Sequence, residues 1–379
     1  MTFEFRLSPK IIFGSKSVEK IPAEIENTGA KKILLVTDEG LAETEILKKI
    51  LDLLENLEVT VFSRVAPNPK EPAVEEGLRV AKDRKCEAVL GIGGGSPMDV
   101  AKMIAAMMTN SGNIWEYEGA DKFRTPPLPL ILVPTTAGTG SEVSRAAMIT
   151  NSVTHRKTLF LSWYLTARTA VLDPELTLGL PQKITVWSGM DALSHAVESY
   201  VSNMSNPLTD VFAEKATELI YKNLERAVKN GSDIEARTNM LLGSLMAGIS
   251  TANARLGNVH ALAHAIGGKY DLPHGLLCGA LLPVVMKYNL DYCRDKLARM
   301  AAIFGLYSED ASTEESAEFA IKLIDGLREK LCLPKKLSEI GVKEDDIPYL
   351  VENTVLIPSN PRPTKKEDLF SLYSAAISG

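Results

Sequence analysis

The residues best suited to chemistry in this sequence are histidines, and they gather in one part of the chain. Only five occur among 379 residues, and three of them, His260, His264 and His274, fall within fifteen residues in GNVHALAHAIGGKYDLPHG. A fourth, His195, lies four residues after Asp191 in SGMDALSHAVES. Residues four apart on a helix share one face, with Cβ atoms about 5–6 Å apart. Asp191 with His195, and His260 with His264, therefore have the spacing of metal-ligand pairs.

A single pair at this spacing is more often a surface feature or a satisfied pair in a core. Two such pairs with a further histidine nearby favour a metal site instead. One aspartate and three histidines suit a divalent transition ion such as Fe²⁺ or Zn²⁺ better than Ca²⁺ or Mg²⁺, which prefer oxygen ligands. The choice between iron and zinc stays open. His155 has neither an acidic nor a histidine neighbour in NSVTHRK, and we assign it to the surface.

A glycine-rich segment, GIGGGSPMDVAK at residues 91–102, follows an apolar run and opens a helical pattern. Three consecutive glycines, Gly93, Gly94 and Gly95, let a ligand approach the backbone closely, and Ser96 can cap the helix. Free amides at a helix start suit a phosphate group. The spacing matches neither a P-loop nor GxGxxG, so the segment by itself is equally consistent with a simple turn.

A second loop of small residues, PTTAGTGSEVS at residues 134–144, follows another apolar run. Its hydroxyl groups can donate to a pyrophosphate or a ribose; they belong to Thr135, Thr136, Thr139 and Ser141. The carboxyl ends of the strands form the ligand crevice in a doubly wound sheet. Two such loops at one edge favour a nucleotide site over two tight turns.

Asp38 ends the run ILLVTD, where its carboxylate can accept hydrogen bonds from a ribose diol. The same charge would repel a 2′-phosphate, so it favours NAD over NADP. Taken alone, an aspartate in this position is more often the N-cap of the following helix.

These side chains need a sheet and helices to position them. Short β-branched runs predict strands at 31–37, 58–62, 87–92 and 129–135, and apolar positions at three and four spacing predict helices at 41–56 and 71–84. This alternation predicts a doubly wound, Rossmann-like parallel sheet covered on both faces. Strand patterns then stop, and helices are expected at 183–202, 207–229, 232–254, 258–268, 294–304 and 313–331.

The chain is therefore expected to form two domains, which its length also favours. We expect a dinucleotide-binding α/β domain at 1–182 and an all-helical metal-binding and substrate domain at 183–379, with a cleft between them as the default site. The formal net charge is −6, and Lys and Arg are scattered among acidic residues, which disfavours nucleic acid and anionic membranes as partners.

Four cysteines occur, without CxxC spacing; they are Cys86, Cys278, Cys293 and Cys332. They are too few and too dispersed to staple a chain of this length, which indicates reduced thiols. The sequence shows neither a leader with an apolar core nor a stretch that could span a membrane. A cytoplasmic location is expected.

Several motifs together resemble the iron-containing (group III) alcohol dehydrogenase family along nearly the whole chain. They occur in family order and are IIFGSKSVEK, APNPKEPAVEEGL, GGGSPMDVAK, PTTAGTGSEVS, DPELTLGLP, GMDALSHAVESY, HALAHAIGGKYDLPHG and NPRPTKKEDL. The resemblance implies a dehydroquinate synthase-like architecture with NAD(H) and Fe²⁺ as cofactors, Zn²⁺ being possible. A homodimer or higher homo-oligomer is expected.

The resemblance also implies roles for particular residues. The metal ligands would be Asp191, His195, His260 and His274, with His264 beside the substrate as a catalytic residue. Cofactor contacts would include Asp38, Asn68, Gly94, Gly95, Ser96, Asp99, Thr135, Thr136, Thr139 and Lys157.

Some positions depart from the family pattern. Ser15 and Ser17 stand in a turn where relatives often carry a further glycine, and Thr251 stands where some relatives carry an aromatic residue. These departures do not affect the assignment to this class of enzyme, but they leave the identity of the substrate undetermined.

The sequence thus predicts hydride transfer between NAD(H) and small primary alcohols or diols and their aldehydes. A glycerol dehydrogenase-like polyol oxidoreductase with zinc is the nearest alternative. A metal-dependent hydrolase would use the same Asp and His set without the glycine loops. A non-catalytic nucleotide-binding scaffold would keep the loops and tolerate loss of His195 or His260.

Overall fold

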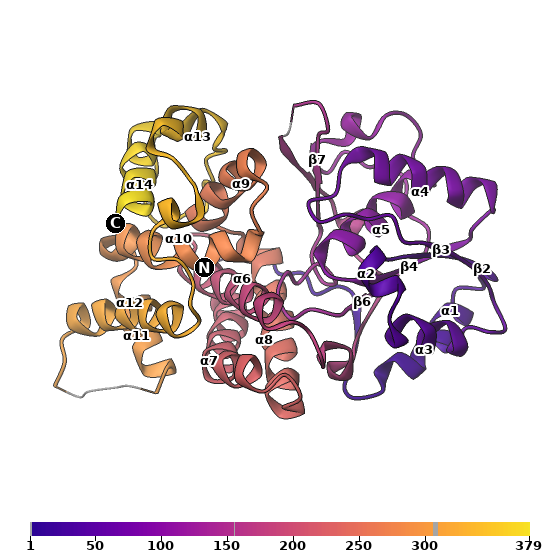
Figure 1. Cartoon of the computed structure of the whole chain (residues 1–379), viewed down its shortest axis with the longest axis horizontal. Coiled ribbons are helices and arrows are strands. Elements are labelled where there is room, and N and C mark those ends of the chain that lie inside the picture. The colour runs from indigo at the N-terminus through magenta and orange to yellow at the C-terminus, as the bar shows by residue number, and fades with distance from the viewer. Residues whose placement is uncertain (1, 155, 306–309) are drawn as a thin grey trace. The chain divides into compact units, whose positions relative to one another are not determined.

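The computed structural model describes residues 2–154, 156–305 and 310–379 (Figure 1). His155, expected at the surface, lies outside the described residues. The chain divides into two compact units, one spanning Leu7–Leu178 and the other Gly179–Gly379 together with the start of the chain up to Arg6. Within the described part, no helix is both long and apolar enough to cross a membrane.

The first unit is built on a six-stranded sheet in the order β1-β9-β6-β4-β2-β3, and every pairing within it is parallel. Its strands are β1 (Lys10–Phe13), β2 (Lys32–Val36), β3 (Glu58–Phe62), β4 (Ala88–Gly93), β6 (Leu130–Pro134) and β9 (Thr169–Leu172). The predicted doubly wound parallel sheet is confirmed.

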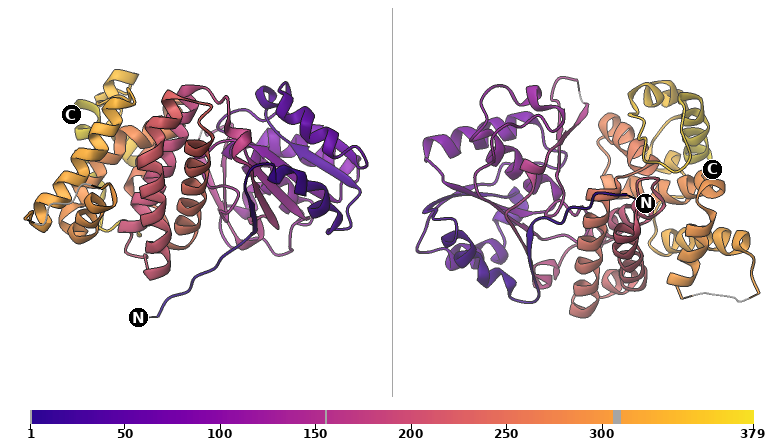
Figure 2. Two further views of the ribbon diagram at one scale, coloured as in Figure 1. Left: turned by 90° about the horizontal axis from the view of Figure 1, so that it is seen from below. Right: turned by 180° about the vertical axis from the view of Figure 1, so that it is seen from behind.

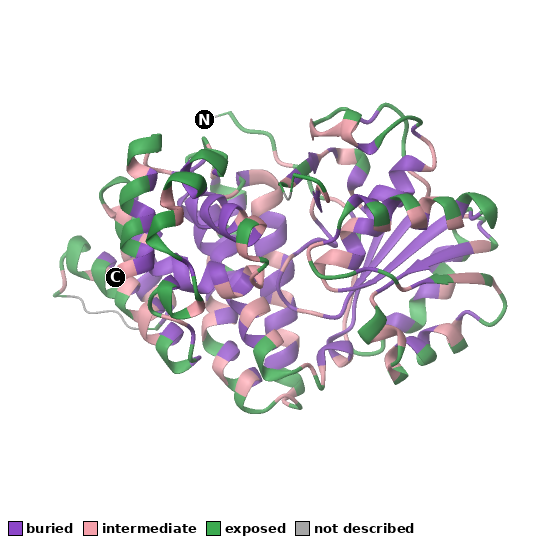
Figure 3. Cartoon of the chain, turned by 45° about the horizontal axis from the view of Figure 1, so that its top comes forward, coloured by how far each residue is buried: buried purple, intermediate pink, exposed green. Residues whose placement is uncertain are grey.

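Alternate side chains of each inner strand enter two separate cores, which explains why the strand sequences are apolar throughout. In β2, Leu34 and Val36 pack in one core, and Ile33 and Leu35 pack in the other. Helices α4 and α5 contribute to the first core and α1 and α3 to the second, on opposite faces of the sheet (Figures 1 and 2). Consecutive residues of the inner strands are buried, as the colouring of the strands in Figure 3 shows, which agrees with helices covering both faces.

The helices of the first unit are α1 (Ile21–Glu26), α2 (Glu39–Ala42), α3 (Glu45–Leu53), α4 (Glu71–Asp83) and α5 (Gly95–Met107). The single helix expected at 41–56 is therefore wrong in detail. Thr44 adopts an extended backbone as the N-cap of α3 and separates it from α2.

A second, three-stranded sheet was not predicted. Its order is β5-β8-β7, with strands β5 (Gly119–Ala120), β7 (Ala146–Thr150) and β8 (Lys157–Leu161). Strands β1 and β9 of the large sheet were also missed. Strands β1, β5 and β9 have only two to four residues, too few for apolar periodicity to separate them from loops.

In the second unit the described residues form helices and no strand. The helices are α6 (Gln182–Val201), α7 (Pro207–Lys229), α8 (Ile234–Ala254), α9 (Asn258–Tyr270), α10 (His274–Asn289), α11 (Arg294–Ile303), α12 (Thr313–Lys330), α13 (Ile347–Asn353) and α14 (Lys366–Ser378). Helices α10, α13 and α14 were not predicted. Gly275, Gly279 and Pro283 obscure α10, because glycine and proline disfavour helix interiors.

The start of the chain packs with the second unit, although the expected 1–182 domain includes it. The amide of Arg6 donates to Asn253 Oδ1 at 2.8 Å, and Asn253 Nδ2 donates back to the Arg6 carbonyl at 3.1 Å. Phe5 stacks on Phe212 of α7 with ring centroids 6.0 Å apart.

Candidate active site

Three helices of the second unit, α6, α9 and α10, bring four potential metal donors together. Asp191 Oδ1 lies 3.5 Å from Nε2 of His260 and 3.5 Å from Nε2 of His274. Cys278 Sγ lies 3.5 Å from His274 Nε2 and 4.0 Å from His260 Nε2. One donor atom from each of the four residues lies within 4.8 Å of all the others. We call this set the donor cluster.

The carboxylate of Asp191 is the clearest sign that the cluster suits a cation. The residue is 3% exposed, and Oδ1 has no hydrogen-bond partner in the structure. Burial raises the pKa of this carboxyl, but the neighbouring imidazoles of His195, His274 and His260 outweigh burial and bring it well below its usual range. An ionised, buried oxygen without a donor is costly. A bound cation would satisfy it.

Two glycines allow α10 to lie close to α6 and so bring the donors within reach. A Cβ atom on Gly275 would overlap the carbonyl oxygen of Trp187, and one on Gly279 would lie 3.2 Å from Met190 Cβ. Both glycines directly follow a cluster residue, His274 or Cys278. A larger residue here would push the two helices apart, because close-packed interiors leave no spare volume.

Glu198 orients the ring of His260, and the sequence analysis missed it. Its Oε2 lies 2.6 Å from His260 Nδ1, and its Oε1 accepts a hydrogen bond of 2.6 Å from the amide of Val259. With Nδ1–H donated to the carboxylate, the Nε2 lone pair of His260 faces the donor cluster. Glu198 follows Asp191 by seven residues, two helical turns, and this spacing was a usable signal.

A buried amide network closes the start of α9, where Gly257 is an N-cap without a side chain. Asn360 Oδ1 accepts from the amide of Asn258 at 3.2 Å and from Asn289 Nδ2 at 3.1 Å. Its Nδ2 donates to Asn289 Oδ1 at 2.8 Å. The NPRPT segment therefore stabilises the helix that carries His260.

The other two histidines lie against the cluster. The ring of His195 stacks on that of His260 with centroids 4.6 Å apart. His264 stacks on His274 at 5.2 Å and meets His260 edge-on at 6.1 Å. His260 is buried, whereas His264 is partly exposed. The structure thus gathers every predicted ligand and His264 in one place, while their roles remain predictions.

Cys278 is the donor that the sequence analysis did not single out. It follows His274 by four residues on α10, the relation that also joins Asp191 to His195 and His260 to His264. The CxxC pattern does not include Cys278, whereas its four-residue spacing from His274 does mark it as a possible donor. Burial raises the pKa of the Cys278 thiol to about 12.

In the first unit, three of the predicted nucleotide-binding features share one edge of the large sheet. Asp38 follows β2, the glycine segment follows β4, and the threonine loop follows β6. These three strands are parallel neighbours, so their carboxyl ends lie side by side. The chain reverses its winding between β2 and β4, which makes this edge the topological switch point where such sheets bind ligands.

At this edge the glycine segment packs so closely against Asp38 and the threonine loop that a side chain at some of its positions would clash. A Cβ atom on Gly93, whose φ is +142°, would lie 3.3 Å from Asp38 Oδ2. One on Gly94 would lie 3.6 Å from Thr136 Oγ1, and one on Gly95 only 2.8 Å from Thr139 Cγ2. The two loops and Asp38 therefore form one surface.

The first turn of α5 has the properties of a phosphate site. Gly94 is its N-cap, and no side chain caps the helix. The predicted cap by Ser96 is therefore wrong, because Ser96 lies inside the first turn. Backbone amides without a side-chain cap at a 13-residue helix start attract anions.

Asp38 does cap a helix, as the simpler interpretation of its position expects. Its Oδ1 accepts a hydrogen bond of 2.9 Å from the amide of Leu41 at the start of α2. Its Oδ2 is the oxygen that faces Gly93. One carboxylate can thus cap α2 and present an oxygen at the nucleotide edge.

Both carboxylate oxygens of Asp99 accept hydrogen bonds from other residues of the first unit. Its Oδ1 accepts from Ser141 Oγ at 2.6 Å and its Oδ2 from the amide of Met148 at 2.9 Å. The buried ammonium of Lys102 donates to the same serine at 2.8 Å. Asp99 therefore holds the threonine loop, and its predicted contact with the cofactor remains untested.

Asn68 and Lys157 form a pair, with Lys157 Nζ donating to Asn68 Oδ1 at 2.7 Å. Asn68 has a left-handed backbone, with φ of 51°. Thr135 is buried, and its amide donates to the carbonyl of Gly93 at 2.9 Å. This bond ties the threonine loop to the glycine turn.

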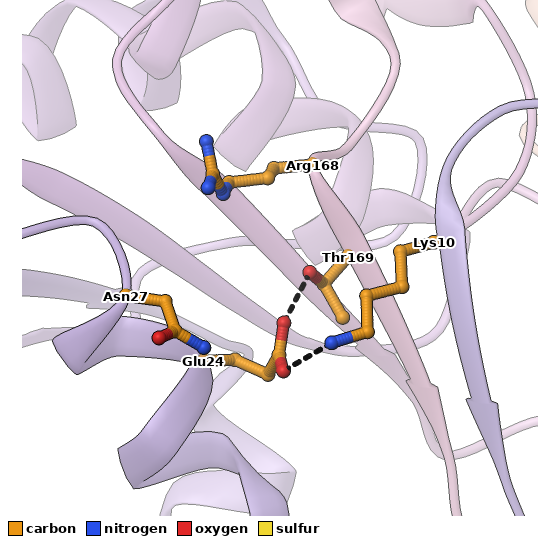
Figure 4. A pocket seen from close by; sticks show the side chains of 5 residues that line it. All are labelled: Lys10, Glu24, Asn27, Arg168 and Thr169. Carbon is orange, nitrogen blue, oxygen red and sulfur yellow. Dashed lines mark hydrogen bonds and ion pairs between the residues drawn. The ribbon is translucent and has the colours of Figure 1, made fainter.

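The open pocket of Figure 4 lies at the other edge of the sheet, where Lys10 begins β1 and Thr169 begins β9. Its carboxylate, Glu24, is already paired with Lys10 Nζ at 2.6 Å and Thr169 Oγ1 at 2.9 Å. None of the predicted site residues lines it. We therefore place no catalytic function there.

Comparison with known proteins identifies the class to which these two sites belong. The profile of the iron-containing alcohol dehydrogenases matches residues 8–174, and that of the C-terminal part of the Fe-containing alcohol dehydrogenase family matches residues 185–377. The chain belongs to the iron-containing alcohol dehydrogenase family. It is an oxidoreductase that acts on alcohols and aldehydes, as the motifs predicted.

Individual relatives cover the whole chain. A 1,3-propanediol dehydrogenase of Citrobacter freundii is 39% identical over 382 residues, 99% of each chain. An NAD-dependent methanol dehydrogenase of Bacillus methanolicus is 36% identical over 378 residues, 98% of this chain and 99% of its own. The crystal structure of a 1,3-propanediol oxidoreductase superposes with a TM-score of 0.97 at 38% identity, covering 100% of both chains.

Proposed function

We propose that this protein interconverts small primary alcohols or diols and their aldehydes, using NAD(H) and one divalent metal ion. The ion is iron, with zinc as the alternative, and its proposed ligands are Asp191, His195, His260 and His274. The observation that carries this proposal is the buried Oδ1 of Asp191, which accepts no hydrogen bond and lies 3.5 Å from two imidazole nitrogens. Carboxylate and imidazole donors suit both ions.

The names of two relatives favour a small substrate. One relative is named for 1,3-propanediol and another for methanol, and each matches this chain over nearly its full length. Both names denote alcohols of three carbons or fewer. We therefore propose a short alcohol or diol, with its aldehyde as the reaction partner.

NAD(H) is the proposed nucleotide, bound at the carboxyl edge of the sheet. The first-turn amides of α5 would take the pyrophosphate, and Asp38 Oδ2 would accept hydrogen bonds from the ribose hydroxyls. Further contacts are proposed from Asn68, Gly94, Gly95, Ser96, Asp99, Thr135, Thr136, Thr139 and Lys157. The related methanol dehydrogenase is named as NAD-dependent, which supports this choice.

When bound, the metal ion supplies a Lewis acid for the substrate oxygen, and the nicotinamide exchanges the hydride. The chain's own residues bind, orient and move protons. Glu198 holds the His260 ring so that Nε2 faces the cluster. His264 is partly exposed and stacks on His274, so we propose that it passes the hydroxyl proton of the alcohol to solvent.

We further propose that residues 1–182 bind the dinucleotide and residues 183–379 the metal and substrate. The protein is proposed to work in the cytoplasm as a homodimer or higher homo-oligomer. All four cysteines are free in the structure, as is usual for proteins of a reducing compartment.

The test is anaerobic turnover with metal analysis of the same preparation. Metal-free protein reconstituted with Fe²⁺ or Zn²⁺ is given NADH and a panel of short aldehydes, and NADH absorbance is followed. We expect metal-dependent oxidation of NADH with at least one aldehyde of three carbons or fewer. Metal binding with neither NADH binding nor NADH oxidation would favour the hydrolase alternative, and NADH binding without any turnover would favour the scaffold.

A further inference from the structure

We propose that Glu71 is a positioning residue for the nucleotide, because its carboxylate fixes the hairpin of β7 and β8 and thereby holds Lys157 beside Asn68. The inference rests on the proposed function, in which Lys157 and Asn68 contact NAD(H). Glu71 is not among the proposed cofactor contacts, and its effect on the nucleotide is exerted through Lys157.

The segment that carries Asn68 and Glu71 starts at the edge of the large sheet where Asp38 lies. Strand β3 ends at Phe62 and pairs in parallel with β2, so the carboxyl ends of the two strands lie side by side. The chain then continues through Asn68 to Glu71, the first residue of α4. Val74 of this helix is buried in the first core of the unit. Glu71 is therefore anchored on a packed helix, which positions a side chain more precisely than a loop does.

Both carboxylate oxygens of Glu71 accept hydrogen bonds from Ser152, which follows β7. Oε2 accepts from the Ser152 amide at 2.8 Å, and Oε1 accepts from the Ser152 hydroxyl. Hydrogen bonds to a carboxylate are roughly twice as strong as bonds between neutral groups. Glu71 is only 8% exposed, so water competes little for these bonds. One side chain thus fixes this point of the hairpin through a backbone donor and a side-chain donor.

The hairpin transmits this constraint to Lys157. Thr150 ends β7 and is paired with Lys157, the first residue of β8. The amide of Thr150 donates to the carbonyl of Pro69 at 2.8 Å. Asn68 directly precedes Pro69, and its Oδ1 accepts from Lys157 Nζ at 2.7 Å. The segment and the hairpin are thus joined at three successive points, and Lys157 is one of them.

A lysine side chain benefits from such support because it is long and flexible. Fixing its rotamers on ligand binding costs conformational entropy. When the hairpin and Asn68 already hold the ammonium group, less freedom is lost as NAD(H) binds, and the affinity is higher. This contribution concerns nucleotide binding and not hydride transfer. It should therefore appear in the Kd and KM for NADH rather than in kcat.

The Glu71→Ala variant removes both bonds to Ser152. We expect the Kd for NADH, measured by fluorescence titration, and the KM for NADH to rise by about tenfold, the usual scale for ordering one long side chain. The kcat at saturating NADH should stay within about twofold. Ser152→Ala keeps Glu71 and loses only the hydroxyl bond, so it should raise the Kd by a smaller factor.

The Glu71→Gln variant tests whether the geometry of the bonds is what matters. Its amide can accept from the Ser152 amide and donate to the Ser152 hydroxyl. It should therefore recover most of the NADH affinity that Glu71→Ala loses. Affinity as low as that of Glu71→Ala would contradict positioning through these two bonds.

The Glu118→Ala variant is the matched control. Glu118 Oε1 lies 2.7 Å from a guanidinium nitrogen of Arg156, which directly precedes β8, and both side chains are exposed. Exposed ion pairs contribute little to stability. The Kd for NADH should equal that of the unmodified protein. An increase as large as that of Glu71→Ala would show that any loss of negative charge near the hairpin acts on the nucleotide, and would overturn the particular role of Glu71.

Combining Glu71→Ala with Lys157→Met separates this inference from the proposed function. We expect Lys157→Met to weaken NADH binding, and Glu71→Ala to add little to it, because residues that act through one another are not additive. Unchanged affinity in Lys157→Met would refute the cofactor contact of Lys157 and the role of Glu71 with it. Weakening by Lys157→Met but not by Glu71→Ala, or two effects that multiply, would overturn the positioning role alone.

Discussion

The donor cluster and the nucleotide edge are built in opposite ways. The cluster consists of side chains on three helices, buried and held by helix packing and by Glu198. The nucleotide edge consists largely of backbone amides and small side chains at the ends of three parallel strands. A metal requires a few particular donor atoms, whereas a pyrophosphate requires space and amides.

Because of this difference, single substitutions should affect the two sites unequally. Replacing one donor in the cluster removes an interaction that no neighbour can supply. At the nucleotide edge the interactions are spread over many groups, so single side-chain changes should adjust affinity or preference. Substitutions in the two sites should therefore differ in the size of their effects.

The Asp191→Asn variant should lose both metal and activity. The amide keeps the volume but removes the charge that would neutralise the ion. We expect turnover to fall by about 10⁴-fold or more, because Lewis-acid stabilisation is worth several kcal/mol. Metal content by elemental analysis and NADH-coupled turnover measure the two losses. Full metal occupancy in this variant would show that Asp191 is not a ligand.

The His264→Ala variant should lose activity and keep its metal. Proton transfer by a positioned side chain contributes roughly 10²- to 10⁴-fold in rate, so kcat should fall on that scale. Bound metal and kcat are measured on one preparation. Loss of the metal would make His264 a ligand, and an unchanged kcat would leave it without a catalytic role.

The Glu198→Gln variant should weaken metal binding by about 10- to 100-fold, the usual effect of losing a carboxylate behind a ligating histidine. The Gln amide can donate to His260 Nδ1, which moves the ring proton to Nε2 and blocks the lone pair facing the cluster. Metal dissociation constants measure the effect. Glu198→Asp is the control, since it keeps the charge and should recover part of the affinity; normal affinity in Glu198→Gln would refute the orienting role.

The Asp38→Asn variant should shift the cofactor preference toward NADPH by about tenfold, because it removes the charge that repels a 2′-phosphate. Asparagine is as good an N-cap as aspartate, so α2 should stay capped. The ratio of kcat/KM for NADH and NADPH measures the shift. The Asp38→Gly variant should shift it in the same direction, although glycine removes the side-chain cap as well. Equal use of both cofactors by the unmodified protein would contradict the prediction.

The two regions also differ in how far the sequence predicted them. The common edge of Asp38, the glycine segment and the threonine loop follows from the sequence, because each directly follows a strand and parallel strands end at one edge. Their contacts with the nucleotide stay predictions. Two details were not predicted: Ser96 does not cap α5, and the oxygens of Asp99 accept hydrogen bonds from Ser141 and Met148. Both details depend on contacts between residues far apart in the sequence, which no local pattern reveals.

In the helical unit, the histidines and Asp191 were found by spacing, but Cys278 and Glu198 were missed. Their partners lie on other helices, so their significance depends on how α6, α9 and α10 pack. The helix that carries Cys278 was itself obscured by its glycines and proline. Two of these glycines, Gly275 and Gly279, allow α10 to lie close to α6.

Residue types and their spacing are enough to predict the class of chemistry: which side chains can ligate, which small-residue loops follow strands, and to which family the motifs belong. These are local properties, set by residue type and spacing along one element. The spacing of residues along one helix does not predict which donors on different helices share one centre, because distances between helices depend on packing across the core. That packing places the Cys278 sulfur 3.5 Å from His274 Nε2 and a carboxylate behind His260.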